Sequence, residues 1–428
     1  MKLPPGPAPR AVRCLVGGTA LALVLSACTP QDDVVTLDFF QFKPEAVANF
    51  EAIIDRFEAE NPGIRVVQNH VPDADTAIRT LLVKDKTPDV LTLNGNGRYG
   101  ELAEACVFAD LSDLPVVEQV RPAVSDIVSE LGSCSADEVN AVPFSSNASG
   151  ILYNKDLFAQ YGVEVPTTWD ELLAAARTFE DAGVPPFYTT LKDAWTVSPA
   201  FVNLGGALQP EDFFDRLRAE GSEVASGEVS FSKDYPEAME KLTTLYGFGQ
   251  DGAASRDYNA GNAAFGAGES AMYMQGSYAI PAIRASNPDA NIGSFPYPAT
   301  NSPEDSVVVS GVDVAVSVGR DTEHPAEARE FVEFLMSPEV VQQYAQEQSA
   351  FSPLATGADA TDPALAGLAP YFEDNRIIGF IDHQLPASLP LPQYLQELAL
   401  GGSVEDFLSV MDREWSKIAA RTIPNEKD

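Results

Sequence analysis

The residue types that most often carry catalysis are sparse in this 428-residue sequence. Its three histidines, His70, His324 and His383, lie far apart, and no H-E-x-x-H or Cys-x-x-Cys pair is present. The G-x-S-x-G turn, which exposes the nucleophile of many serine hydrolases, does not occur. With 63 acidic residues, a carboxylate pair suited to glycoside cleavage could form by chance, so this number favours no reaction. The sequence therefore predicts neither a catalytic residue nor a metal site.

One glycine-rich motif could bind a ligand. It fits G-x-G-x-x-G, the spacing of dinucleotide-binding turns, and reads Gly95-Asn96-Gly97-Arg98-Tyr99-Gly100. Nicotinamide cofactors are scarce outside the cytoplasm, where the N-terminus directs this chain, so we predict no cofactor. We interpret the glycines as letting the backbone approach a small ligand, while Arg98 and the first amides of a helix donate hydrogen bonds. The alternative is a simple tight turn between a strand and a helix.

Strand-like and helix-like segments alternate around this motif. Apolar or β-rich runs cover residues 34–40, 64–68 and 89–93, and apolar residues at helical spacing cover 46–57, 76–83 and 99–106. This order predicts a parallel sheet covered by helices, and hence an α/β protein. Such sheets bind ligands beyond the carboxyl ends of their strands, where this chain places Gln41 and Lys43 after the first strand and Asn94, Asn96 and Arg98 after the third.

The first 33 residues predict export and a lipid anchor. Basic residues precede an apolar run over residues 15–24, and Leu25-Ser26-Ala27-Cys28 follows it. This order is typical of a secretory signal peptide, which we predict at 1–27. A cysteine directly after the cut resembles the lipobox of bacterial lipoproteins, so we predict that Cys28 is lipidated and that residues 28–33 form a lipid-anchored linker. No later segment is apolar over the roughly 20 residues that span a bilayer.

The charge of the chain restricts the partners that it can bind. The formal net charge of −36 predicts no binding to nucleic acid and no electrostatic docking on anionic lipid.

Once Cys14 leaves with the signal peptide and Cys28 carries lipid, Cys106 and Cys134 remain as a pair in an oxidising compartment. We therefore predict a disulfide between them, which would contribute about 3 kcal/mol to stability.

Several stretches of the mature chain resemble one family, in that family's order. They are a strand and turn at 142–158 with the phrase YNKDLF, a helix start PTTWDEL at 166–172, FGAGESAM at 265–272 running into QGSY at 275–278, and a return strand at 310–317 followed by FVEFLMSPE at 331–339. Together they resemble the extracellular solute-binding proteins of ABC importers, in particular the carbohydrate-binding, maltose-binding-protein-like group. The resemblance spans nearly the whole mature chain.

The resemblance implies a two-lobed, periplasmic-binding-protein-like α/β fold with hinge strands and a ligand cleft that closes by hinge bending. We place lobe I at 34–143 and 310–337, and lobe II at 144–309 and 338–428. The implied function is to capture a mono- or oligosaccharide and deliver it to the permease subunits of an ABC importer, without catalysis. The protein would be a monomer, anchored on the outer face of the cytoplasmic membrane, at the cell surface or in the periplasm.

A sugar cleft needs flat aromatic faces and polar groups for hydroxyls. By its place in the resemblance, Tyr278 replaces the family's stacking Trp, and Trp195 looks like a second stacking residue; core packing is the alternative for each. Asn147 is expected to bind a hydroxyl, and Asp313 either reaches the cleft or caps a hinge. Two other functions stay open: the same fold binding a polyol, polyamine or other small solute, and a secreted glycosidase with carboxylates about 5 to 10 Å apart.

Overall fold

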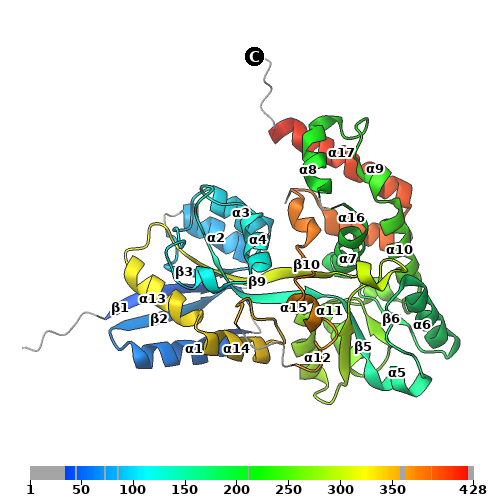
Figure 1. Ribbon diagram of the computed structural model, residues 1–428, viewed down its shortest axis with the longest axis horizontal. Helices are drawn as coiled ribbons and strands as arrows, with labels where there is room; N and C mark the ends of the chain where they lie inside the picture. Colours follow the sequence, from blue (N-terminus) through cyan, green and yellow to red (C-terminus); the bar gives the residue numbers. More distant parts are fainter. Residues whose placement is uncertain are drawn as a thin grey trace, which may run out of the picture.

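The computed structural model describes residues 34–43, 46–71, 74–83, 86–210, 212–356, 362–386 and 388–422. The predicted signal peptide, the linker and Cys28 lie outside the described residues. Within the described part, no helix combines the length and the apolar character needed to cross a membrane. The chain forms two lobes, each an α/β unit with its own sheet and core (Figure 1).

Lobe I is built on a six-stranded sheet with the main strand order β10-β9-β3-β1-β2, in which β4 also pairs with β9. Strand β1 runs parallel to β2 and β3, whereas β9 runs antiparallel to β3 and β4. The parallel part is the βαβ opening expected from the sequence. The strands are β1 (Val35–Gln41), β2 (Ile64–His70), β3 (Val90–Leu93), β4 (Val142–Ser149), β9 (Val308–Val318) and β10 (Ile377–Ile378).

Helices cover the lobe I sheet because each presents an apolar face to it. In α1 (Val47–Glu60) the buried residues Phe50, Ile53, Ile54 and Phe57 follow helical spacing. The helix stops at Asn61, just before a Pro-Gly pair that cannot continue it. The other helices of this lobe are α2 (Ala74–Val83), α3 (Gly97–Glu104), α4 (Pro122–Ser129), α13 (Pro325–Leu335) and α14 (Pro338–Glu347).

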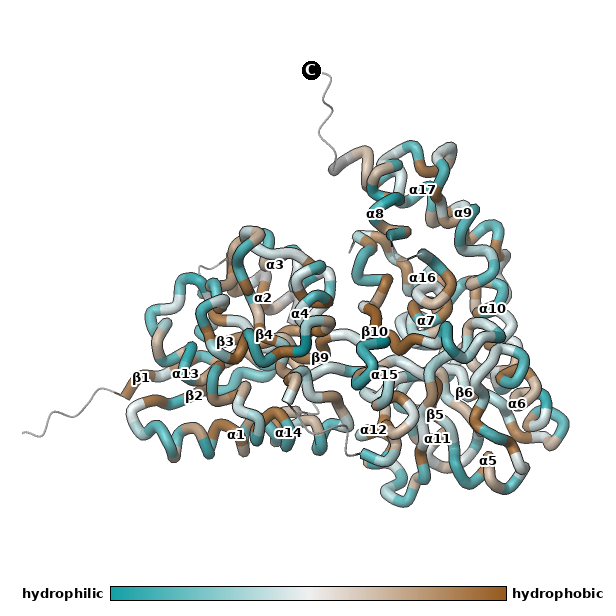
Figure 2. The backbone as a smooth tube through the Cα atoms, in the orientation of Figure 1, coloured by the Kyte–Doolittle hydropathy of each residue, from teal (hydrophilic) through white to brown (hydrophobic). Residues whose placement is uncertain are grey.

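Lobe II holds a four-stranded sheet of order β6-β7-β5-β8. Its strands are β5 (Ile151–Asn154), β6 (Phe187–Tyr188), β7 (Met272–Tyr273) and β8 (Ile292–Phe295). The surrounding helices are α5 (Lys155–Tyr161), α6 (Trp169–Asp181), α7 (Ser198–Leu208), α8 (Phe213–Glu220), α9 (Phe231–Asp234), α10 (Pro236–Gly247), α11 (Tyr258–Gly266), α12 (Ile280–Ser286), α15 (Ala369–Glu373), α16 (Leu391–Ala399) and α17 (Val404–Thr422). Figure 2 shows hydrophobic residues along the strands and the inner helix faces, with hydrophilic residues on the outer turns.

The chain crosses between the lobes along β4, along β9 and again after α14 (Figure 1). Strand β9 starts in the apolar clusters of lobe II, at Val308 and Val309, and continues into the lobe I core from Val312 to Val318. The boundary predicted at residue 337 differs from this arrangement. The turn there leads directly into α14, whose apolar face packs on lobe I, and the lobe I core extends to Leu354. The third crossing therefore follows Leu354, and β10 later pairs with Val308 and Val309, at the lobe II end of β9.

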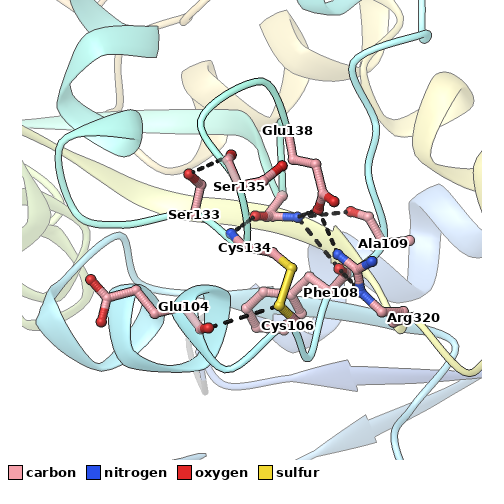
Figure 3. Close-up of a disulfide and its surroundings, with 10 residues drawn as sticks. Glu104, Cys106, Phe108, Ala109, Ser133, Cys134, Ser135, Glu138 and Arg320 are labelled. Carbon is pink, nitrogen blue, oxygen red and sulfur yellow. Dashed lines mark hydrogen bonds and ion pairs between the residues drawn. A yellow bond between two sulfur atoms is a disulfide. The ribbon is translucent and has the colours of Figure 1, made fainter.

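The predicted disulfide between Cys106 and Cys134 is present (Figure 3). Cys106 lies just past the end of α3, and Cys134 lies in the loop that leads toward β4. The side chain of Asn140 fixes this loop: its Oδ1 accepts a hydrogen bond from the Cys134 amide at 2.8 Å, and its Nδ2 donates to Phe108 O at 3.4 Å. The bridge thus anchors the C-terminal end of α3, and with it the helix that carries the glycine motif.

Candidate functional site

The polar residues predicted after the first strand are brought together, but they bond to one another. The Lys43 ammonium contacts the Asp313 carboxylate of β9, and the two side chains are only 9% and 10% exposed. The Gln41 side chain holds the Lys43 backbone, because its Nε2 donates to Lys43 O at 2.7 Å and its Oε1 accepts from the Lys43 amide. Asn94 donates to the backbone oxygen of Asp313 at 3.4 Å. The result is a neutral ion pair at the carboxyl edge of the lobe I sheet.

The glycine motif lies at the start of α3 and makes close contacts within lobe I. The Asn96 side chain caps α3, accepting hydrogen bonds from the amides of Arg98 at 3.0 Å and Tyr99 at 3.2 Å. Those amides, expected to donate to a ligand, are therefore occupied, and the Arg98 guanidinium contacts the Glu101 carboxylate. A Cβ atom at Gly100 would lie 1.9 Å from Leu131 O, so this glycine is required by a neighbouring loop. The side-chain oxygen of Asn96 is thus a helix cap, and its contact with a ligand stays a prediction.

Lobe II contributes three aromatic rings in mutual contact. Trp195 on the short helix η3 (Ala194–Val197) lies 4.9 Å from Tyr258 and 6.4 Å from Tyr278, measured between ring centroids. Trp195 is 41% exposed, and Tyr278 on η6 (Ser277–Ala279) is half-buried. Burial, with a smaller contribution from Tyr258, raises the pKa of Tyr278 well above its usual value. The two predicted stacking residues thus lie together, and Tyr258 joins them without any sequence signal of its own beyond its place at a helix start.

Asn147 lies between the crossing strands and not on an open surface. It pairs with Gly311 across β4 and β9, and its Oδ1 accepts a hydrogen bond from the Gly311 amide at 3.0 Å. Its backbone oxygen accepts a hydrogen bond from Ser310 Oγ at 2.8 Å. The amide oxygen expected to meet a ligand hydroxyl is therefore used by the strands that connect the lobes. The side chain is 9% exposed.

A segment that the sequence analysis missed lies between the lobes. In η8 (Ile381–Gln384), the Oδ1 atom of Asp382 is buried without a hydrogen-bond partner. Burial raises the pKa of Asp382, although the charge of His383 and backbone amide bonds from Asp382 and His383 to the carboxylate act in the opposite direction. Burial lowers the pKa of His383. The segment reaches both lobes: a Cβ atom at Gly97 would lie 3.6 Å from His383 O, and Ile381 packs against Gly205 of α7. The adjacent Asp-His pair, in a chain with three histidines, was the available signal.

We define the interlobe surface as Gly97, Trp195, Tyr258, Tyr278, Asp382 and His383. Tyr278 lies close enough to Tyr258 and Asp382 that, after burial, the charges of both groups raise the pKa of Tyr278. Aromatic faces bind the apolar faces of sugar rings, and an unpartnered carboxylate oxygen accepts hydrogen bonds from hydroxyls. Among the described residues, no group of three or more His, Cys, Asp and Glu is arranged to hold a metal ion.

Fold and sequence together define the class of protein. Residues 43–342 match the family described as bacterial extracellular solute-binding protein, and the chain belongs to this family. It is 28% identical over 343 residues to the multiple sugar-binding protein of Streptococcus mutans, which covers 77% of this chain and 79% of that protein. It is 24% identical over 347 residues to the melibiose/raffinose/stachyose-binding protein MelE of Bacillus subtilis, with 78% and 76% covered. Among solved structures, RafE in complex with raffinose superposes with a TM-score of 0.77 at 27% identity, over 90% of this chain and 100% of that chain. The family resemblance and the two-lobed fold expected from the sequence are thereby confirmed.

Proposed function

We propose that this protein binds a neutral oligosaccharide between its lobes and delivers it to the permease of an ABC importer. The observation that carries the proposal is the cluster of Trp195, Tyr258 and Tyr278, together with the unpartnered Asp382 Oδ1, whose carboxylate charge helps to raise the pKa of Tyr278. Such a combination suits a ligand with apolar ring faces and hydroxyl edges. Relatives that bind raffinose-type saccharides support the same ligand class. We assign no catalytic step to the protein.

The charges argue for an uncharged ligand. An anion such as a sugar phosphate needs a cation to pair with, whereas the Lys43 ammonium is already neutralised by Asp313. Near the same edge, the Arg98 guanidinium contacts Glu101. Next to the aromatic cluster, the Lys192 ammonium is paired with Asp257, and the Asp382 carboxylate would repel a phosphate. The second candidate is a cationic solute such as a polyamine, because a carboxylate beside aromatic rings also suits an ammonium group.

A ligand screen separates these candidates. Purified mature protein is tested by thermal shift with melibiose, raffinose and stachyose, with glucose 1-phosphate, and with spermidine. A ligand present at 100 times its Kd stabilises the protein by about 2.7 kcal/mol. We expect a shift with a neutral saccharide; a shift with spermidine alone would favour the second candidate, and a shift with glucose 1-phosphate alone would refute the charge argument.

Truncation of the stacking residue then tests the site. Tyr278→Ala removes a flat face worth about 1 to 3 kcal/mol, so calorimetry should give a Kd about 10- to 100-fold weaker. Tyr371→Ala is the matched control, because Tyr371 is also a half-buried tyrosine of lobe II, but its ring lies on α15 and faces the Arg376 guanidinium at 4.7 Å. Equal losses in both variants would place the binding site elsewhere.

We further propose that the exported chain is cleaved after residue 27 and held at the outer face of the cytoplasmic membrane by lipid on Cys28. Membership of an extracellular family and the Leu-Ser-Ala-Cys sequence support this anchor. Cys28→Ala should move the protein from the membrane fraction to the soluble fraction, or leave it unprocessed. Unchanged fractionation together with unchanged lipid labelling would contradict the proposal.

A further inference from the structure

The hydroxyl of Tyr278 belongs to a directed chain of hydrogen bonds behind the aromatic rings. Asn203 on α7 donates from Nδ2 to Ser149 Oγ of β4 at 2.7 Å. The Ser149 hydroxyl in turn bonds to the Tyr278 oxygen, and the Tyr278 hydroxyl donates to Gln275 Oε1 at 3.3 Å. The Gly276 amide also bonds to the Tyr278 oxygen, so the Tyr278 hydroxyl is surrounded by donors and directs its own proton to Gln275. Because burial keeps the pKa of Tyr278 high, its hydroxyl stays protonated and remains a donor.

Gln275 extends this chain to the other stacking residue. Its side-chain nitrogen Nε2 donates to Thr196 O at 3.4 Å, and Thr196 directly follows Trp195 on η3. The same backbone oxygen accepts a hydrogen bond from the Tyr246 hydroxyl at 3.2 Å. The side-chain amide of Gln275 therefore makes both contacts. Its oxygen bonds to the Tyr278 hydroxyl, and its nitrogen bonds to the backbone oxygen of Thr196, the residue after Trp195. Gln275 is 2% exposed, so it does not itself present a surface to a ligand.

We propose that Gln275 is a positioning residue that fixes Trp195 and Tyr278 relative to each other before a ligand arrives. The two rings lie 6.4 Å apart with 58° between their planes. Trp195 is the more exposed ring and would otherwise have to be ordered at the moment of binding. Pre-ordering one such side chain is worth up to about tenfold in affinity. The inference rests on the proposed function, because the geometry of these rings affects binding only if they contact the ligand.

A double-mutant cycle tests the link to Tyr278. Gln275→Leu removes both hydrogen bonds at similar size, and Tyr278→Phe removes the hydroxyl but keeps the ring. With raffinose as the probe in calorimetry, we expect each single variant to bind about 3- to 10-fold more weakly. The double variant should be no weaker than the weaker single variant, because both changes break the same bond. Losses that multiply in the double variant would show that Gln275 does not act through Tyr278, and an unchanged Kd would overturn the proposal outright.

A measurement without ligand tests the link to Trp195. Of the tryptophans, Trp195 is the most exposed, so acrylamide quenching of intrinsic fluorescence reports mainly on it. Gln275→Leu should change the quenching constant, whereas Gln209→Leu should not. Gln209 is the control because its Nε2 also donates to a backbone oxygen, that of Asp234 at 2.5 Å, at the far end of α7. Identical quenching in the wild type and in Gln275→Leu would refute the positioning role.

The calorimetric experiment and the quenching experiment test the role of Gln275 separately from the proposed function. If wild-type protein binds no saccharide, the proposed function fails, and quenching still decides whether Gln275 restrains Trp195. If Gln275→Leu does not fold, Gln275→Glu takes its place: it keeps an acceptor for the Tyr278 hydroxyl but loses the donor to Thr196 O. Altered quenching in Gln275→Glu supports the proposal, and unaltered quenching overturns it.

Discussion

We predict that Asp382 lowers the stability of the ligand-free protein and increases its affinity for the ligand. The Oδ1 atom is buried without a hydrogen-bond partner, and burial raises the pKa of the carboxyl group. An unsatisfied buried polar group costs about 1 to 3 kcal/mol, so Asp382→Asn, which removes the charge at nearly constant shape, should stabilise the ligand-free protein by about 1 kcal/mol. A hydrogen bond from a ligand hydroxyl to a carboxylate contributes about 1.5 to 3 kcal/mol. The same variant should therefore bind the saccharide about 10- to 150-fold more weakly.

Two measurements on the same preparations decide this prediction: Kd by calorimetry and the free energy of unfolding by urea titration. Asp374→Asn is the control, since it removes an exposed carboxylate shortly upstream. Binding to the wild type should also weaken as pH falls through the raised pKa of Asp382, and this dependence should disappear in Asp382→Asn. The stability of the ligand-free wild type should instead increase as pH falls through this range, because the folded state binds the Asp382 proton more tightly than the unfolded state does. Wild-type affinity together with reduced stability in Asp382→Asn would show that the carboxylate is structural.

Three further perturbations test the framework around the site. Lys43→Met should lower the free energy of unfolding by about 3 kcal/mol, because Asp313 is left buried and unpaired, and the added change Asp313→Leu should recover part of that loss in urea denaturation. Replacing Cys106 and Cys134 by Ala should cost about 3 kcal/mol, and the midpoint of the double variant should no longer respond to dithiothreitol. Burial alone would raise the pKa of Asp362, but bonds from a neighbouring arginine and two other donors outweigh it and lower the pKa. Asp362→Asn should thus flatten the loss of stability as pH falls through the acid range, measured by melting at a series of pH values.

The sequence predicted those parts of the fold that rest on local signals. Apolar spacing and a Pro-Gly break are enough to define α1, because the helix needs one apolar face and a stop. The disulfide followed from compartment and from the small number of cysteines. Trp195 and Tyr278 came from short phrases whose order matches a known family, and the structure places their rings together.

The remaining parts depend on partners distant in sequence. The hydrogen bond between Asn147 and Gly311 could not be predicted, because nothing near Asn147 in the sequence reveals a partner on another strand. A ligand contact of Asn147 stays a prediction. Asp382 was missed because burial leaves its carboxylate oxygen without a partner, and burial is a property of the folded chain. The boundary predicted at residue 337 meets the same difficulty, because a turn between two helices does not say on which lobe the second helix packs.

Strand β9 has a consequence for how the protein is made. Its eleven residues, Val308–Val318, contribute to the apolar clusters of both lobes, and β3 pairs with β1 on one side and β9 on the other. During synthesis the ribosome releases β1 and β3 more than two hundred residues before β9, so the lobe I sheet cannot close early. The lobes are therefore expected to complete folding and to unfold as one cooperative unit, in a single calorimetric transition. A chain whose lobe I sheet closes late stays unfolded for longer during its synthesis, so its export, proposed above, would have more time to begin.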